Sequence, residues 1–380
     1  MIFTSLFVGF VVARFALLVQ ARRIAKLEDV LVGDAPRAWP SVSVVVAARN
    51  EAEGITEALG SLLGLDYDAI EVIVVNDRST DQTADQVRRL AATDKRLRLI
   101  NVNELPPGWL GKNHALQVGS KAASGEWILF TDADVVFSPH ALRRAITFVE
   151  RERLDHLALL MKAWSRSFIV DAFIGYFALQ FLLFVRPWEA KDPLKPHRFV
   201  GVGAFNLVRK SALQGVEGLT RIAMRPDDDV KLGKILKQAG FRQDCLTAVE
   251  DLSVEWYPSL RACIQGLEKN MFAGTDYRVS LVMVAVIAGL LVTALPVYLL
   301  LSLSGALWWA VVLALALEFL VSLVAARRTA KSLACVLVYP ITALLFSYIS
   351  ARTTIKNLRD GGIYWRETFY PLSELRKNRV

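Results

Sequence analysis

The chain has 380 residues, 54% of them hydrophobic and 22% charged, and a mean hydropathy of +0.36, which excludes a wholly soluble protein of about two domains. The apolar content also excludes intrinsic disorder, and three cysteines exclude a secreted scaffold held by disulfides, so we expect the main folded domain to be cytosolic. The net charge of +8 would suit nucleic acid, but the basic excess lies beside apolar segments where anionic headgroups attract it, so we expect a membrane partner and no nucleic acid.

An apolar segment opens the chain. Residues 1–19 are interrupted only by Arg14, and basic residues follow them. About 20 apolar residues suffice to cross a bilayer, and positive charge after the run favours an uncleaved anchor over a signal peptide. We therefore predict an N-terminal transmembrane anchor over residues 1–21, followed by a cytoplasmic linker over residues 22–40.

Strand and helix patterns alternate in the next part of the chain. Residues 41–47 and 71–76 are β-branched apolar runs that predict buried strands, with a helix at 53–63 between them. A third apolar run covers residues 126–130. This alternation predicts a parallel sheet in an α/β domain over residues 41–276, and in such sheets ligands bind beyond the carboxyl ends of the strands.

Further apolar runs predict more membrane association. Residues 167–188 carry an aspartate and a glutamine, so we predict an interfacial or substrate-covering helix there and not a span. Residues 279–351 form the predicted C-terminal transmembrane region, in which 279–326 divides into two spans and 333–351 is a third, broken by Pro340.

The topology of these spans is in conflict with the charge of the tail. Three spans after a cytosolic domain would leave residues 352–380 outside, yet this basic and aromatic tail carries seven basic and three acidic residues, which favours a cytosolic or interfacial position. Either the segment with Pro340 is re-entrant or interfacial, or one predicted span is wrong. Glu318, which is costly in lipid, should face another helix or an aqueous cavity.

Two aspartates follow the third predicted strand. Asp132 and Asp134 set two carboxylates on either side of one residue, and Mg²⁺ typically takes one or two protein carboxylates together with phosphate oxygens and water. A DxD triplet alone is a weak signal, because acidic turns after strands are common.

Polar residues also follow the first two strands. They stand at 47–51 and 76–83, where side chains can read a base and a ribose, and Asp77 can accept a hydrogen bond from a pyrimidine imide N–H. A second interpretation makes Ser79, Thr80 and Asp81 the N-cap of a following helix, and both interpretations can hold together.

The three motifs, in this order and spacing, resemble the nucleotide-sugar-binding half of a membrane-bound family 2 glycosyltransferase of the GT-A fold, over about residues 41–275. Gly108 to Leu116 is most similar to enzymes related to ceramide glucosyltransferases and to bacterial glycosyltransferases that modify carotenoids and hopanoids. The resemblance implies a Rossmann-like, mostly parallel sheet in a multi-pass protein of the bacterial plasma membrane.

The resemblance also implies a donor site. It assigns the metal, Mg²⁺ or Mn²⁺, to Asp134 and Asp132, and it places Lys112 near the nucleotide diphosphate, unless Lys112 is a solvated loop residue. Ala47 stands where proline is common, a change that backbone contacts survive. The nucleotide-sugar-binding residues that it implies are Ala47, Arg49, Glu51, Asp77, Lys112, Asp132 and Lys269.

The catalytic residues that the resemblance implies lie at 225–229. This stretch resembles the family's Glu-Asp motif, which gives Asp229 the role of general base and puts Asp228 in the glutamate position. Three adjacent carboxylates repel one another and raise the pKa of at least one of them, which suits a base. The alternative is an acidic helix N-terminus favoured by the helix dipole.

A later motif departs from the family pattern. Polymerising members carry Gln-x-x-Arg-Trp where this chain has Gln265, then Glu268 and Lys269, which argues against a processive polysaccharide synthase. Lys269 either reaches the diphosphate or acceptor or belongs to a polar turn of an interfacial helix. We expect His197 and residues 200–206 to line the acceptor side.

The activity implied is metal-dependent, inverting transfer of a sugar from a nucleoside diphosphate donor, with UDP preferred, to a hydroxyl of a membrane lipid such as a terpenoid, a diacylglycerol or a ceramide. The alternatives are a polyisoprenyl-phosphate glycosyltransferase, a polysaccharide synthase, or a membrane-tethered nucleotide-sugar-binding protein without turnover. A dinucleotide-dependent oxidoreductase is poorly supported, because no Gly-x-Gly-x-x-Gly follows the first strand.

Overall fold

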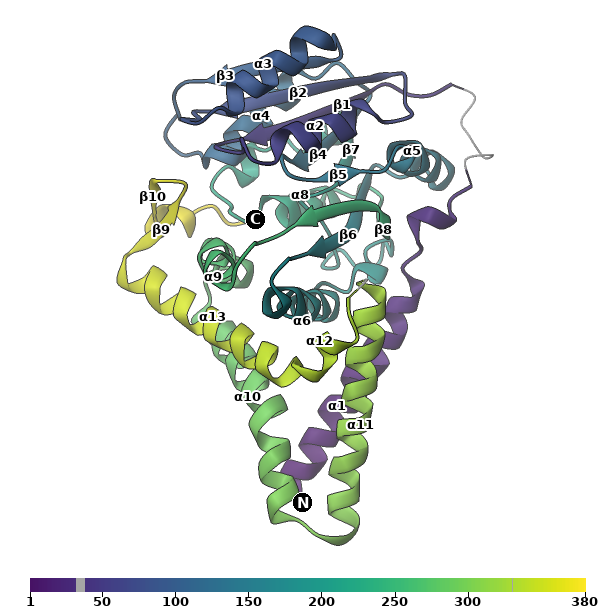
Figure 1. Ribbon diagram of the computed structural model, residues 1–380, viewed down its shortest axis with the longest axis vertical. Helices are drawn as coiled ribbons and strands as arrows, with labels where there is room; N and C mark the ends of the chain where they lie inside the picture. Colours follow the sequence, from purple (N-terminus) through teal and green to yellow (C-terminus); the bar gives the residue numbers. More distant parts are fainter. Residues whose placement is uncertain (32–37, 330) are drawn as a thin grey trace. The chain divides into compact units, whose positions relative to one another are not determined.

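The computed structural model describes residues 1–31, 38–329 and 331–380 (Figure 1). The chain divides into two compact units, and each is described by itself. The α/β unit comprises Ile24–Lys162, Pro187–Val254 and Lys377–Val380. The helical unit comprises Met1–Arg23, Ala163–Arg186 and Glu255–Arg376.

Within the described residues, one sheet of eight strands has the order β3-β2-β1-β4-β7-β6-β8-β5. Four neighbouring strands are parallel, namely β3 (Leu97–Val102), β2 (Ile70–Asp77), β1 (Val42–Ala48) and β4 (Trp127–Asp132). β7 (Asn206–Arg209) runs antiparallel to β4 and β6 (His156–Trp164), and β5 (Val136–Phe137) runs antiparallel to β8 (Gln243–Glu255). The α/β fold with a mostly parallel sheet, predicted from the three apolar runs, is confirmed.

Two helices build the main core of the α/β unit against this sheet. Leu116 of α4 (Gly111–Ala122) and Ile235 of α8 (Asp228–Gln238) pack with strand residues such as Ile73 and Phe130. Each large apolar side chain buried in this way contributes about 1.5–3 kcal/mol. The unit's other α-helices are α2 (Ile55–Leu63), α3 (Thr83–Thr93), α5 (Ala141–Glu152) and α7 (Lys210–Gly215).

A glycine lets α4 lie close to the sheet. A Cβ at Gly119 would stand 2.4 Å from Val45 Cγ1, so any larger residue would push the helix away. The first turn of α4 is thereby held beside the ends of β1 and β2, where the polar motifs begin.

The helical unit contains α1 (Ile2–Gln20), α6 (Phe168–Val185), α9 (Leu260–Leu267), α10 (Val279–Ser302), α11 (Gly305–Arg328), α12 (Ala334–Leu337), α13 (Tyr339–Arg359), the hairpin β9 (Gly362–Trp365) and β10 (Thr368–Pro371), and α14 (Leu372–Leu375). Figure 1 shows α1, α10 and α11 running together, and Phe7 and Val11 of α1 form a core with Leu299 and Val311 from the other two. A second core joins α6, α9 and α13 through Phe173, Leu267 and Ile349.

Four described helical segments are long and apolar enough to cross a membrane: Ile2–Arg23, Phe168–Glu189, Val279–Ser302 and Gly305–Arg327. The second of them is the helix predicted to be interfacial. The predicted third C-terminal span, 333–351, is not among them. It divides into α12 and α13, and Pro340 stands in the first turn of α13, where a helix tolerates proline, so it begins a helix and does not break one.

Glu318 faces another helix, as its cost in lipid predicts. Its Oε1 lies 3.0 Å from Nη2 of Arg14 on α1, and both residues are 6% exposed. Arg14 also donates to the hydroxyl of Tyr339. The two charges that interrupt the apolar runs therefore neutralise each other inside the helical unit.

Some predicted boundaries differ from the division into units. Residues 24–30 of the predicted linker belong to the α/β unit, where Leu27 is fully buried and Thr247 N–H donates to Ala25 O at 2.9 Å. Residues 32–37 of that linker lie outside the described residues. The predicted tail divides, since Lys377–Val380 belong to the α/β unit.

Candidate active site

The site is built where β4 ends and α4 begins. Asp132 is the last residue of β4, and its neighbour in register on β1 is Ala47. Lys112, the second residue of α4, places its Nζ 2.8 Å from Asp132 Oδ1. Three residues predicted from separate motifs thus meet at the edge of the sheet.

The first turn of α8 supplies carboxylates to the same place. Asp227 is the N-cap residue, and Asp228 and Asp229 are the first two residues of the helix. Asp228 Oδ2 lies 3.6 Å from Lys112 Nζ. One ammonium group therefore contacts the DxD motif and the acidic motif, which stand almost 100 residues apart in the sequence.

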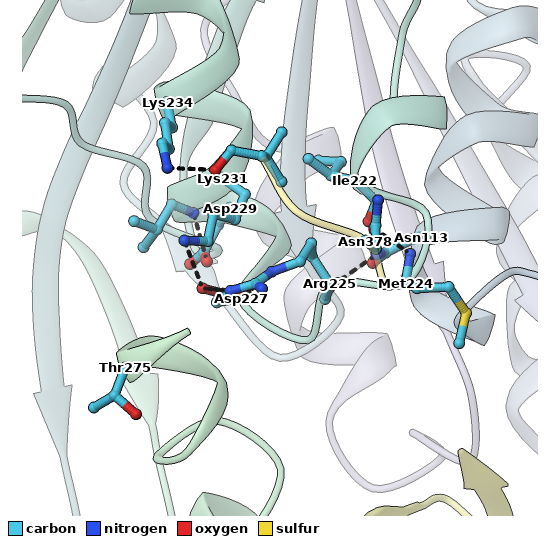
Figure 2. Close-up of polar contacts among 12 residues, drawn as sticks. Asn113, Ile222, Met224, Arg225, Asp227, Asp229, Lys231, Lys234, Thr275 and Asn378 are labelled. Carbon is cyan, nitrogen blue, oxygen red and sulfur yellow. Dashed lines mark hydrogen bonds and ion pairs between the residues drawn. The ribbon is translucent and has the colours of Figure 1, made fainter. Parts of the chain in front are cut away.

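The third carboxylate, Asp227, is occupied elsewhere. The buried Arg225 guanidinium donates to both of its oxygens, at 2.8 and 2.9 Å, and Lys231 Nζ lies 3.6 Å away (Figure 2). This bidentate pair fixes the start of α8 and leaves Asp228 and Asp229 as the carboxylates that face the site.

The pKa values follow from this crowding of charge. Burial, the neighbouring Asp228 and, more weakly, Asp132 raise the pKa of Asp229 to about 7, while Lys112 and the Val230 N–H oppose the rise. Burial disfavours the charged form of Lys112, but Asp132, Asp228 and Asp229 outweigh it and raise the pKa of its ammonium. Lys112 stays a cation, and Asp229 titrates near neutral pH.

Glycines on the segment before β7 open space beside the carboxylates. A Cβ at Gly203 would lie 2.8 Å from Asp132 Oδ2 and 3.4 Å from Asp229 Oδ2. At Gly201 it would lie 1.8 Å from the backbone oxygen of Asp229. Side chains at these positions would fill the gap between the two acidic motifs.

Asn206 supports Asp229 from behind. Its Nδ2 donates to the backbone oxygen of Asp229 at 3.3 Å, and its Oδ1 contacts Nε2 of His156. Burial lowers the pKa of His156 to about 4, so the ring is neutral at physiological pH and donates through Nε2 to this oxygen. Sequence reasoning placed Asn206 on the acceptor side but missed His156, whose signal is only a lone histidine in an apolar run.

A cavity lies among these residues. The residues that line it come from α4, β4, the segment before β7, β7 itself, the loop before the 3₁₀ turn at Thr220–Ile222, and α8: Lys112, Leu116, Phe130, Thr131, Asp132, Gly203, Asn206, Leu219, Asp228, Asp229 and Leu232. Four predicted positions, Lys112, Asp132, Asp228 and Asp229, thus share one cavity with Gly203 and Asn206 of the predicted acceptor stretch. His197 is exposed and does not line it.

The loops that follow β1 and β2 are bonded to each other. Asn50 N–H donates to Ser79 Oγ at 3.0 Å, Thr80 N–H donates to Asn50 Oδ1 at 2.8 Å, and Glu51 N–H donates to Thr83 Oγ1 at 2.9 Å. Gln82 is the N-cap residue of α3, so none of Ser79, Thr80 and Asp81 stands at the N-cap position itself. Asp81 still supports the start of the helix, because its Oδ1 accepts from the N–H of Thr83, the first residue of α3, at 2.9 Å. Its Oδ2 accepts from Ala52 N–H of the neighbouring loop at 3.1 Å, since parallel strands bring both loops to the same edge.

Asp77 ends β2 and is held by arginines. Nε and Nη2 of Arg78 donate to its two oxygens at 2.7 and 3.1 Å, and Nη1 of Arg49 lies 3.8 Å away. Gly111 leaves room for this pair, since a Cβ there would stand 2.3 Å from Asp77 Oδ2. Sequence reasoning missed Arg78, which has a positive φ of 55° that favours glycine.

The residues at the end of β4 fit a hard divalent cation. Asp134 reaches solvent, yet its dense protein surroundings and the charges of Asp132 and Glu51 raise its pKa to about 7, while Lys112 opposes the rise. Within the described residues, no group of three or more His, Cys, Asp or Glu is arranged to hold a metal. Two carboxylates nevertheless suffice for Mg²⁺ or Mn²⁺ when a diphosphate completes the shell.

Lys269 lies in the helical unit. Its ammonium stands 4.3 Å from the ring centre of Trp365 on β9, while the adjacent Glu268 pairs with Arg352 and Lys356 of α13. The structure thus joins Lys269 and Glu268, which follow α9, to residues of α13 and of the basic and aromatic tail within one unit.

Comparison with known proteins identifies the fold and the domain. A profile describing Glycosyl transferase family 2 matches residues 43–214. An uncharacterized glycosyltransferase of Haemophilus influenzae is 31% identical over 121 residues, which are 32% of this chain and 36% of that protein. The 4,4'-diaponeurosporenoate glycosyltransferase of Staphylococcus aureus is 38% identical over 98 residues, 26% of this chain and 24% of that protein. The chain thus spans about a third or less of the length of these curated relatives.

A solved structure shows the same fold over nearly the whole chain. The mannosyltransferase PcManGT from Pyrobaculum calidifontis, in complex with GDP-Man and Mn²⁺, has a TM-score of 0.55 and 22% sequence identity, covering 94% of this chain and 99% of that one. The predicted GT-A fold is therefore confirmed, and the chain carries a Glycosyl transferase family 2 domain.

Proposed function

We propose that this protein is a metal-dependent, inverting glycosyltransferase that moves a sugar from a nucleoside diphosphate donor to a hydroxyl group of a membrane lipid. One observation carries the proposal. Lys112 Nζ lies 2.8 Å from Asp132, on the donor side, and 3.6 Å from Asp228, next to the proposed base. A cation between the two acidic motifs suits a site in which a diphosphate leaves as a hydroxyl attacks.

The donor half of the site consists of Ala47, Arg49, Glu51, Asp77 and Lys112, with Asp132 and Asp134. In this proposal Asp77 accepts from the nucleobase, which favours UDP as the carrier, and Lys112 binds the diphosphate. Mg²⁺ or Mn²⁺ held by Asp132 and Asp134 would supply Lewis-acid stabilisation of the charge that develops on the leaving diphosphate. PcManGT, which shares the fold, was solved with GDP-Man and Mn²⁺.

Asp229 is the proposed general base. Its carboxylate takes the proton of the acceptor hydroxyl while the oxygen forms a bond to the anomeric carbon and the bond to the diphosphate breaks. Its pKa of about 7 suits this role, because a base works best when its pKa is near the ambient pH. A single displacement without a protein nucleophile inverts the anomeric centre, so an α-linked donor gives a β-linked product.

The acceptor is proposed to be a lipid because apolar helices make up so much of the chain. Four described segments have the length and composition of membrane spans. One relative is named 4,4'-diaponeurosporenoate glycosyltransferase, after a carotenoid. Lys269 remains a proposed ligand of the diphosphate or of the acceptor headgroup.

We further propose a membrane topology with three spans, α1, α10 and α11. Residues 22–278 and the tail after α11 then both lie in the cytosol, which satisfies the basic excess of the tail. In this arrangement α13 is interfacial, and its last turns carry Arg352, Lys356 and Arg359. The loop between α10 and α11 would then lie outside the cytosol. Reporter fusions test this topology: a reporter at Ser304, in that loop, should report the outer side, and one at Asp360, after α13, should report the cytosol.

Transfer of radiolabel from a panel of UDP- and GDP-sugars into organic-extractable lipid tests the proposal. Membranes containing the wild type, Asp229→Asn or no added protein are compared. We expect labelled lipid with the wild type alone. Label in a water-soluble or polyisoprenyl-phosphate product would reassign the acceptor, and donor binding without any transfer would support a binding protein instead.

A further inference from the structure

The loop that leads into the acidic motif is held by buried side chains of its own, such as Ile222 and Arg225, and by polar side chains from other parts of the chain. Residues 221–226 connect a 3₁₀ turn at Thr220–Ile222 to α8, and they carry the backbone directly into Asp227, Asp228 and Asp229. The conformation of this loop therefore sets where the carboxylates of α8 stand relative to Lys112.

Asn113 binds this loop from the donor side. The residue is fully buried on α4, next to Lys112, and its Nδ2 donates to the backbone oxygens of Ile222 and Arg225 at 2.8 and 2.9 Å. Leu110 N–H donates to Ala223 O at 2.9 Å. The first turn of α4, which positions Lys112, is thereby fixed to the loop that positions the proposed base.

Asn378 binds the same loop from a distant part of the sequence (Figure 2). Its Oδ1 accepts from Met224 N–H at 2.9 Å, and its Nδ2 donates to Arg221 O at 2.9 Å. The amide of Asn378 accepts and donates at once, whereas aspartate or leucine of similar size would lose one or both bonds.

The segment around Asn378 has a second attachment. Lys234, on α8, donates through Nζ to Val380 O, and Val380 packs against the main core of the α/β unit. Residues 255–376 all belong to the helical unit, and the chain returns to the α/β unit only at Lys377. Lys377–Val380, here named the clamp segment, thus contacts both the loop and the helix that carry the acidic motif.

We infer that Asn378 is a positioning residue for the proposed reaction, which holds residues 221–226 so that Asp228 and Asp229 keep their places beside Lys112. The inference rests on the proposed function, in which Asp229 is the base. It assigns a role at the active site to a segment that composition alone marks as a basic tail.

The bonds themselves are tested by amide hydrogen exchange of the full-length protein in detergent. In Asn378→Ala, peptides covering residues 221–229 should exchange about tenfold faster or more, because Met224 N–H loses its acceptor. The matched control is Arg379→Ala, which removes an exposed side chain from the same segment and should leave this exchange unchanged. Unchanged exchange in Asn378→Ala would overturn the inference.

The catalytic role is tested with the same variants. Asn378→Ala should lower kcat for label transfer by about 10- to 100-fold, since small displacements of a base cost that much, while the Kd for UDP or GDP with Mn²⁺ stays at the wild-type value. Asn378→Asp keeps the bond from Met224 and should be intermediate. Equal loss of nucleotide binding would indicate general misfolding and contradict a positioning role.

Two other outcomes separate this inference from the proposed function. Faster exchange together with wild-type kcat would show that the clamp exists but positions nothing that matters for catalysis, which overturns the inference alone. A wild-type protein that transfers no sugar from any donor removes the proposed function, and the catalytic role of Asn378 is then overturned with it.

Discussion

Lys112 forms ion pairs with Asp132 at 2.8 Å and with Asp228 at 3.6 Å, which joins the first turn of α4 to the end of β4 and to the start of α8. Lysine is the residue type that can approach both carboxylates with a single point charge on a flexible stem. This contact makes the electrostatics of the two acidic motifs depend on one another.

Substitution of Lys112 should therefore affect both halves of the site. In Lys112→Met we expect donor affinity to fall by about 10- to 100-fold, as is typical when a charged hydrogen bond is lost. The pKa of Asp229 should rise further, because a nearby positive charge that lowers it is gone. Nucleotide titration and a pH profile measure the two effects, and Lys112→Arg serves as the charge-preserving control. A profile that does not move would contradict the coupling.

The pH dependence of transfer should report Asp229. The base works only as a carboxylate, so kcat/KM should rise with pH through about 7 and level off above it. In Asp228→Asn the negative neighbour is removed while burial remains, so the pKa of Asp229 should fall and the acid limb should move to lower pH. An acid limb that stays in place would show that another group is titrating.

Gly203 should not tolerate a side chain. The Cβ of Gly203→Ala would lie 2.8 Å from Asp132 Oδ2 and 3.4 Å from Asp229 Oδ2, so the two carboxylates would have to move apart. We expect transfer to fall by about tenfold or more. The control is Gly60→Ala on α2, where open space surrounds the new methyl group. Helix propensity predicts that this substitution raises the free energy of unfolding by about 0.5–1 kcal/mol. Full activity in Gly203→Ala would mean that the gap is not used.

The stability of the protein should depend on Arg14 and Glu318 together, and not on each residue independently. Removing one partner by Glu318→Leu or Arg14→Met leaves a buried charge and should destabilise the protein by about 3–5 kcal/mol, whereas the double variant should recover much of that loss. Thermal unfolding in detergent with all four proteins gives the coupling energy. Additive losses in the double variant would exclude a direct interaction.

Local patterns account for the features of the site that the sequence predicted. Apolar runs, β-branched in the first two, marked β1, β2 and β4, and parallel strands bring their carboxyl ends together, so the positions of Ala47, Asp77 and Asp132 followed from the pattern. Lys112 and Asp229 were placed by resemblance to the family motifs. The structure brings Lys112, Asp132, Asp228 and Asp229 around one cavity.

Single polar side chains that act over long sequence distances left no such pattern. Asn113 and Asn378 are ordinary residues in a helix and a polar tail, and only the fold shows that they bind the same loop. The α12 and α13 region stayed open in the sequence for a different reason, because hydrophobic length alone does not distinguish a span from a helix that starts at Tyr339, with Pro340 in its first turn, and becomes basic along its length.

The most direct test of the account separates donor binding from transfer in one variant. The binding of UDP or GDP with Mn²⁺ and the transfer of label into lipid are measured on the same preparations of wild type and Asp229→Asn. We predict that the variant binds the nucleotide within about twofold of the wild type and loses transfer by about 1,000-fold or more, the upper range for removal of a general base. Wild-type transfer by Asp229→Asn, or parallel loss of binding and transfer, would contradict the assignment of Asp229 as the base.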